Sequence, residues 1–232
     1  MKKNYLFSLG LLVSLLTLSS FNDDPGNRRN KINGHEYVDL GLSVKWATCN
    51  VGASSPEESG GYYAWGETEE KEIYDFSTYK WCDGSAETMT KYCTGNSCGK
   101  VDNKVVLDPQ DDVAYVKWGR RWRMPTVAEI AELHSKCSWE WVTLNGVKGY
   151  NVTGPNGNSI FIPAVGRRDG SCLDLDGSSY YWSSSLGGSF SLGNFSLGNH
   201  SYSAFDLVFD SDCPVFLIGS RCYGHCVRPV CE

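Results

Sequence analysis

The chain has 232 residues, a formal net charge of −6 and a sequence pI of about 5.3. This length suffices for one large domain or two small ones, and a folded unit of about 200 residues buries roughly 70% of its unfolded surface without a covalent staple. The acidic balance argues against nucleic acid as a partner. Frequent aromatic residues (8 Trp, 13 Tyr and 9 Phe), 25 Gly and only 8 Pro are typical of many short strands joined by tight turns.

The N-terminus is predicted to be a secretory signal peptide, residues 1–20. Lys2 and Lys3 precede the apolar run YLFSLGLLVSLLTL, which ends at small serines. The run is too short to span a membrane comfortably, so we expect no membrane span after cleavage. LSSFNDD resembles a bacterial lipobox, but Phe21 occupies the place of the acylated cysteine, and lipid anchoring is not expected. The chain is therefore expected to be exported and either secreted or held at the bacterial cell surface.

A polar linker is predicted at residues 21–33, followed by a domain at residues 34–232. At the start of the domain, HEYVDLGLSVKWATCNVG alternates like two short strands around a glycine turn. Next, Ser55, Pro56 and Glu58 form the pattern of a capping box with proline at the first helical position. This pattern predicts a one-turn helix.

Residues 68–112 are polar, carry scattered Tyr and Trp and have no sustained period, which predicts a long irregular excursion. RMPTVAEIAELHSKC then predicts the clearest helix, with Thr126 as its cap and Glu129 returning the hydrogen bond. Its apolar face is expected to carry Val127, Ile130, Leu133 and Cys137. The strand-like runs that follow are WEWVTL, KGYNVTG, SIFIPAVG, YYWSSS, SAFDLVFD and HCVRPV. Two early helices and many later strands predict an α+β fold.

Five longer motifs follow one another along residues 34–230: YVDLGLSVKWATCNVGASSPEESGGYYAWGE, GRRWRMPTVAEIAEL, GPNGNSIFIPAVG, YYWSSS and VRPV. In content and order they resemble the Fibrobacter succinogenes major paralogous domain family. This exported bacterial family is related to the C-type-lectin-like and formylglycine-generating-enzyme folds. The resemblance implies a C-type-lectin-like fold with small twisted antiparallel sheets, two short helices, long irregular loops and chain ends that lie together. The family has little settled function, so kinship of fold does not by itself assign one.

Ten cysteines in an exported chain predict disulfides, although their spacing does not give the connectivity. Cys82 and Cys93 flank a short polar segment and could close a loop. Cys49 and Cys137 lie among apolar or aromatic residues and are predicted to be buried thiols.

Residues near the C-terminus allow three kinds of metal site, none of which is predicted. Formylglycine-generating enzymes carry two copper-binding thiols in this region, but Cys222 and Cys226 differ from them in spacing and are predicted to be a disulfide or two incidental thiols. A zinc site built from Cys213, Cys222, His225 and Cys226 lacks the usual paired spacing. The calcium motifs of sugar-binding C-type lectins are missing, and DLDG at 174–177 is too short to replace them. We therefore expect no catalytic residues, no metal site and no cofactor.

The composition changes near residue 186. Residues 186–226 contain no Lys, Glu, Gln, Met or Trp, whereas these types make up 32 of the 165 residues at 21–185. The earlier frequency would place about eight of them in the later stretch. Mutating the adenines of asparagine codons yields a set of residues that excludes these five types. Diversity-generating retroelements vary their targets in this way, often at the end of a C-type-lectin-like domain. The alternative is a Gly/Ser-rich loop that lacks long charged residues for ordinary reasons.

The residues expected to be varied lie in a variable binding region at 203–226. SAFDLVFDSD alternates, so Phe205, Leu207 and Phe209 are expected to face the core together with the later Val227. The apolar row 215–218 cannot all face inward, so PVFLIGSRCY is expected to be a presented surface and not a core strand. The predicted ligand-binding residues are Asp206, Val208, Asp210, Cys213, Val215, Leu217, Ile218, Gly219, Ser220, Cys222 and Tyr223. Ser203, Phe216, His225 and Cys226 fit the pattern less closely.

The favoured interpretation is a secreted binding protein whose C-terminal face contacts a protein or glycan on another cell, a phage or a host surface. The alternatives are a thiol or copper oxidoreductase using Cys222 and Cys226, and a structural component of a surface assembly. Arg221 is expected to anchor its turn through a carboxylate such as Asp210 or Asp212. The tandem repeat FSLGNFSLGN at 190–199 is read as replication slippage tolerated in a surface loop.

Overall fold

The computed structural model describes residues 30–175, 177–188, 191–192, 195–196 and 201–232. The predicted signal peptide, Phe21 and most of the predicted linker lie outside the described residues, as does most of the repeat at 190–199. Within the described ranges, no helix has the length and apolar character needed to cross a membrane.

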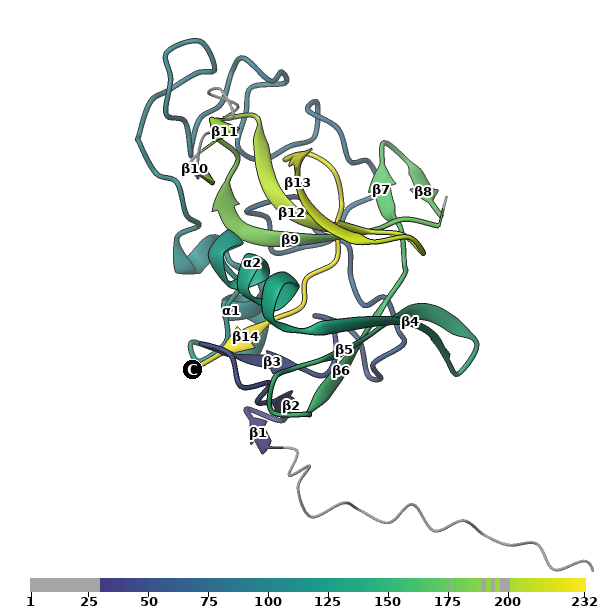
Figure 1. The fold of residues 1–232 in the computed structure, drawn as a ribbon. Coiled ribbons are helices and arrows are strands. Elements are labelled where there is room, and N and C mark those ends of the chain that lie inside the picture. Colours follow the sequence, from purple (N-terminus) through teal and green to yellow (C-terminus); the bar gives the residue numbers. More distant parts are fainter. Residues whose placement is uncertain (1–29, 176, 189–190, 193–194, 197–200) are drawn as a thin grey trace, which may run out of the picture.

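A sheet of four short strands joins the two ends of the described chain (Figure 1). β1 (Asn30–Ile32) pairs with β2 (His35–Val38), β2 pairs with β3 (Lys45–Ala47), and β3 pairs with β14 (Val230–Cys231), all antiparallel. The two ends of the described part of the chain thus lie in one sheet, as the expectation for the domain required. The domain begins earlier than predicted, because residues 30–33 form a strand and its turn and not the end of a linker.

A long segment of turns, bends and isolated bridges follows β3 and runs to the short 3-10 helix η1 (Pro109–Asp111). The irregular excursion predicted at residues 68–112 is confirmed. The helix α1 (Val113–Trp118) comes next and was not predicted. Its N-terminus is stabilised by Asp112, whose carboxylate accepts hydrogen bonds from the first amides of the helix.

The one-turn helix predicted from Ser55 and Glu58 is wrong. The Glu58 amide does donate to the Ser55 carbonyl at 3.3 Å, but this closes only a turn. The Glu58 carboxylate accepts from the Ser54 amide at 2.6 Å, one residue before the expected cap. Gly60, with φ of 67°, then turns the chain away from helical geometry.

The helix α2 (Val127–Lys136) is confirmed, together with its capping box. The Thr126 hydroxyl accepts from the Glu129 amide at 3.3 Å, and the Glu129 carboxylate accepts from the Thr126 amide at 2.8 Å. Ile130 and Leu133 are buried, as their spacing predicted.

Two three-stranded antiparallel sheets build the rest of the domain, so the coarse α+β prediction is confirmed. One has the order β4 (Ser138–Leu144), β5 (Val147–Thr153), β6 (Ser159–Pro163). The other has the order β13 (Pro214–Ser220), β12 (Ser203–Phe209), β9 (Ser179–Leu186). Two small hairpins complete the set: β7 (Arg167–Asp169) with β8 (Cys172–Asp174), and β10 (Ser191–Leu192) with β11 (Phe195–Ser196). Of the predicted runs, only HCVRPV fails to form a strand over most of its length.

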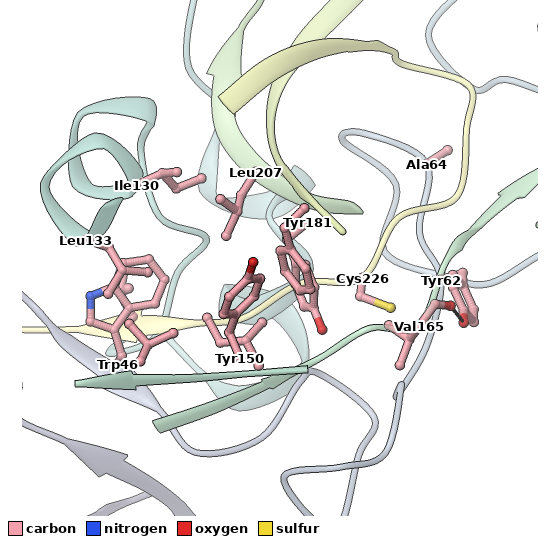
Figure 2. Packing of buried hydrophobic residues seen from close by; sticks show 14 of the residues in the cluster. Trp46, Tyr62, Ala64, Ile130, Leu133, Tyr150, Val165, Tyr181, Leu207 and Cys226 are labelled. Carbon is pink, nitrogen blue, oxygen red and sulfur yellow. Dashed lines mark hydrogen bonds between the residues drawn. The ribbon is translucent and has the colours of Figure 1, made fainter. Parts of the chain in front are cut away.

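The main core lies between α2, the β9–β12–β13 sheet and the β4–β5–β6 sheet (Figure 2). Leu207 of β12 meets Ile130 and Leu133 of α2 on one side and the aromatic rings of Tyr150 and Tyr181 on the other. The four residues predicted to face the core are all buried: Phe205, Leu207, Phe209 and Val227. The inward face of β12 is therefore as the alternation predicted.

Arg221, directly after β13, is fully buried and fixes this end of the sheet to the irregular segment. Its Nε donates to the Tyr79 hydroxyl at 2.8 Å, and its terminal nitrogens donate to the carbonyls of Lys91, Tyr92 and Ser201 at 2.7–3.2 Å. The predicted anchor to Asp210 or Asp212 is wrong. Those carboxylates lie in the turn between β12 and β13, and the whole of β13 separates them from Arg221.

Replacing Leu207 by Ala should lower the free energy of unfolding by about 2–5 kcal/mol, because it leaves a cavity in the core. The matched control is Leu217→Ala on the paired strand, where the side chain is 51% exposed and the change should stay within about 0.5 kcal/mol. Chemical denaturation of the purified variants measures both values. Equal losses in the two variants would contradict the assignment of the two faces.

Candidate binding face

One face of the β9–β12–β13 sheet packs against the main core, and part of the opposite face is covered by a second buried cluster that includes Trp182 and Ala204. Pairing in register places Asp206 between Leu217 of β13 and Trp182 of β9, and Val208 between Val215 and Tyr180. Residues paired in this way point to the same side of a sheet. The outer face is therefore formed by Tyr180, Trp182, Asp206, Val208, Val215, Leu217 and Gly219.

The eleven predicted ligand-binding residues differ widely in exposure. Asp210, Cys213, Val215 and Leu217 are exposed, and Val208, Ile218, Gly219, Ser220 and Tyr223 are half-buried. Asp206 and Cys222 are buried. Three aliphatic side chains of the outer face are exposed or half-buried: Val208, Val215 and Leu217. We call these three residues the aliphatic strip.

The structure corrects the prediction at Ile218, Asp206 and Cys222, as well as at Gly219 below. Ile218 lies on the inward side of β13 and not on the outer face with Leu217, because it pairs with the inward-facing Phe205. Asp206 does point to the outer face but is covered by the segment that follows β13. Cys222 lies in the core after β13 has ended.

The stretch PVFLIGSRCY is mainly a strand, β13, at the edge of its sheet. Its side chains alternate between the two sides. Phe216 packs against the core and near the His134 ring, whereas Val215 and Leu217 are 37% and 51% exposed. The prediction that this stretch is a presented surface and not a core strand is therefore too simple. One side of β13 packs against the core and the other side is exposed.

A buried pair, Asp206 and His225, lies at one end of the outer face. Asp206 Oδ2 is 3.4 Å from His225 Nδ1, and the His225 ring stacks on Trp182 with centroids 3.8 Å apart. His225 is held there through backbone hydrogen bonds in both directions with Tyr63. In the described part of the chain, Asp206 Oδ1 and both ring nitrogens of His225 have no hydrogen-bond partner.

Burial sets the protonation of this pair. Desolvation raises the pKa of Asp206 to about 8 and, with the charge of Arg167, lowers the pKa of His225 well below 6.5. Near neutral pH both groups are therefore mainly uncharged. A neutral carboxyl beside a neutral imidazole suits a dry location, where an unpaired charge is strongly destabilising.

Gly219 makes room for this pair. A Cβ at this position would lie 2.7 Å from Asp206 Oδ2, 3.0 Å from His225 Cε1 and 3.2 Å from Trp182 Cη2. Any side chain at Gly219 must displace one of these groups. The residue therefore allows the pair to pack and is not a free contact position, in contrast to the prediction.

Arg167 of β7 borders the outer face and was not predicted. Its guanidinium lies between two rings, 4.7 Å from the centroid of Tyr180 and 4.9 Å from that of Tyr223. One of its nitrogens is 3.8 Å from the Asp174 carboxylate. No motif around Arg167 indicates this role, because its partners lie on β8, on β9 and in the segment after β13.

The thiols of Cys222 and Cys226 are both buried. Burial raises the pKa of Cys222 to about 11 and raises that of Cys226 further, so neither thiol is ionised at neutral pH. Cys226 points into the core, as Figure 2 shows. Cys213 lies at the opposite end of β13, so the suggested set of zinc ligands is not assembled. Over the described residues, no group of three or more His, Cys, Asp or Glu side chains is placed to hold a metal ion.

A cavity of about 600 Å³ lies in another part of the domain, beside β2, β5 and β6. It shares no residue with the outer face. Its lining is mixed and includes the charged Lys31 and Glu36 as well as the aromatic Trp118 and Phe161. The predicted binding region therefore corresponds to a surface and not to a pocket.

Comparison with family models, with curated proteins and with solved structures finds no match to this chain. The functional interpretation consequently depends on the outer face and on the composition of residues 186–226.

Asp206 should make the stability of the protein depend on pH. Its pKa is higher in the fold (about 8) than its ordinary value of 3.8, so the folded state holds a proton that the unfolded state releases. Its contribution is complete at low pH and is lost as the pH rises through about 8. The lowered pKa of His225 acts in the opposite sense, but only below about 6.5. Between about pH 6.5 and pH 8, stability should therefore fall by at most about 1.4 kcal/mol per pH unit.

Urea denaturation across this pH range measures the slope. The Asp206→Asn variant should flatten it, since an amide does not titrate. The exposed Asp210→Asn variant, in the adjoining turn, is the matched control and should retain the slope of the unmodified protein. A slope that is unchanged in Asp206→Asn would contradict the assignment.

Gly219→Val should lower the free energy of unfolding by about 1–3 kcal/mol, because the new side chain overpacks the Asp206–His225 pair. Leu217→Val, two residues away on the same strand, is the control and should stay within about 0.5 kcal/mol. Thermal or chemical unfolding measures both. An unaffected Gly219→Val protein would show that this end of the outer face is open to variation.

Proposed function

We propose that this protein is an exported, C-type-lectin-like binding protein whose outer face contacts a macromolecular ligand on another cell, a phage or a host surface. We further propose that a diversity-generating retroelement varies this face. The observation that carries the proposal is a coincidence of composition and exposure. The stretch without Lys, Glu, Gln, Met and Trp contains both strands that bear the aliphatic strip.

The architecture supports the fold named in the proposal. Small antiparallel sheets, two α-helices, a long irregular segment and joined chain ends are the features that the resemblance to the Fibrobacter succinogenes major paralogous domain implies. Export is supported by the sequence of residues 1–20.

The chemistry of the outer face favours a protein as the ligand. Val208, Val215 and Leu217 offer apolar area on a sheet whose other side is fixed in the core. The half-buried Tyr223 and Arg167 at the border are of residue types enriched at energetically important protein contacts. A sugar needs a dense array of hydrogen-bonding groups, which an aliphatic strip does not provide.

Binding is favoured over catalysis for the same region. The only thiols that suggested an oxidoreductase, Cys222 and Cys226, are buried with raised pKa values. Asp206 and His225 are buried as an uncharged pair with no access to a substrate.

A display library tests whether the outer face is a scaffold for binding. One library randomises the accessible positions Val208, Asp210, Val215, Leu217 and Tyr223. A matched library randomises exposed positions elsewhere, namely Ile73, Val105, Val106, Val116 and Leu173. Selected against hen egg lysozyme as the probe, the first library should yield binders with Kd below about 1 μM and the second should not. Equal yields from both would remove the special role of the face.

Sequencing tests the diversification separately. The coding DNA for residues 203–226, compared among isolates, should differ mainly at the accessible positions. A near-copy template with asparagine codons at those positions should lie nearby. Identical sequences without such a template would refute diversification and leave binding by the outer face to be judged by the library.

A further inference from the structure

Two buried cysteines of the irregular segment lie side by side. The Sγ atoms of Cys93 and Cys98 are 2.8 Å apart, closer than the roughly 3.5–4.0 Å at which unbonded heavy atoms pack. Both sulfurs also approach the Gly95 carbonyl, at 3.1 Å and 2.9 Å. An approach of less than about 1 Å brings the two sulfurs to the disulfide distance of about 2.0 Å.

The backbone holds each cysteine in place independently of the sulfurs. The Asp102 carboxylate accepts from the amides of Tyr92 and Cys93 at 2.9 Å and 3.0 Å. The Cys98 carbonyl accepts from the Met89 amide at 2.7 Å. The proximity of the thiols is thus a consequence of how the loop is folded, and forming a bond requires little movement of the chain.

We propose that Cys93 and Cys98 form a disulfide in the exported protein. Each thiol loses its proton, the two sulfurs form one bond, and the two electrons pass to the disulfide of a dithiol oxidase or of glutathione, which is reduced to thiols through a mixed disulfide. The expectation from the sequence, a bridge from Cys82 to Cys93, is replaced. Cys82 directs its sulfur to the carbonyls of Phe76 and Tyr79 instead.

The bridge closes the loop that holds Arg221. The carbonyls of Lys91 and Tyr92, next to Cys93, accept hydrogen bonds from the Arg221 guanidinium. The Thr94 amide donates to the Ser201 hydroxyl, just before β12. A covalent link at this point therefore stabilises the contacts that hold the chain just before β12 and just after β13, the two strands that carry the aliphatic strip. Burial, with the neighbouring Cys98 sulfur, also raises the pKa of the Cys93 thiol, which makes it a slow leaving group and favours persistence of the bond.

Peptide mass spectrometry tests the bond directly. Cleavage after Lys91 and Lys100 releases residues 92–100, which contain both cysteines and no other. The full chain, exported from a bacterial host and alkylated with iodoacetamide in denaturant without reductant, should give this peptide two hydrogen atoms lighter than the dithiol and unlabelled. A peptide labelled on both cysteines, or linked to a third cysteine, would overturn the proposal.

Oxidation in vitro separates this inference from the question of export. Reduced protein, incubated folded with oxidised glutathione, should form the same internally linked peptide. The exposed Cys172 and Cys213 should instead be recovered as mixed disulfides with glutathione. An oxidised product in which Cys93 or Cys98 is linked to a third cysteine would contradict the geometry whatever the location of the protein in the cell.

Thermal unfolding measures the consequence for stability. Without reductant, the Cys93→Ser/Cys98→Ser variant should unfold roughly 4–9 °C below the unmodified protein. With reductant the difference should become small. The Cys172→Ser control should match the unmodified protein under both conditions. A difference that is equally large with and without reductant would show that the serines disturb packing and that no bridge is present.

Discussion

The buried guanidinium of Arg221 is the interaction on which the C-terminal half of the domain depends. Removing a cation from water is strongly unfavourable unless it finds several good partners. Here the partners are carbonyl oxygens and a tyrosine hydroxyl, with the rings of Trp65, Tyr79 and Tyr92 within 5.7 Å of the guanidinium carbon. The dependence is mutual. The guanidinium needs acceptors, and the carbonyls of Lys91 and Tyr92 need a donor because they lie in a segment without strands or helices. The irregular segment therefore acquires a defined shape from a residue more than a hundred positions away.

A second buried guanidinium, that of Arg228, fixes the chain around residues 47–50 near the N-terminal end of the domain. It donates to the carbonyls of Ala47 and Thr48 and to the Asn50 side chain at 2.6–3.1 Å. Burial lowers the pKa of Arg228. Arg221 and Arg228 flank the short segment that brings His225 over the outer face. The position of His225 beside Asp206 is thus fixed by a buried arginine before it and another after it along the chain.

The sequence predicted what local physical chemistry determines. The capping box at Thr126 and the alternation of Phe205, Leu207 and Phe209 were sufficient to place α2 and the inward face of β12. Failure occurred where distant segments decide the outcome. The alternation correctly places Asp206 on the outer face, but Asp206 is buried there by the segment that carries His225. Gly219 was predicted to be a ligand-contact position, and only the groups that pack against it show that a side chain there would displace Asp206, His225 or Trp182.

The same distinction explains why the direction of the side chains on β12 and β13 was predicted better than their accessibility. A period of two assigns side chains to faces, so the outward direction of Val208, Val215 and Leu217 follows from local rules once β13 is recognised as a strand. Whether an outward residue is accessible depends on what covers the sheet. Local patterns predicted neither Arg167 at the border of the face nor the pairing of Asp206 with His225 beside Gly219.

The proposed diversification requires that residues 203–226 fold whatever side chains they carry, and the arrangement of buried and exposed residues is compatible with that requirement. The residues that fix the fold are directed to the core or lie after the strand, as with Leu207 and Arg221, which are both buried. The aliphatic strip points the other way, and none of its residues belongs to the two buried clusters of the described chain. Substitutions on it are therefore expected to change the surface chemistry at little cost in stability, whereas substitutions at Asp206 or Gly219 are expected to disturb packing. If the proposed diversification operates, burial limits the positions that tolerate it to the exposed and half-buried ones, whatever the sequence bias.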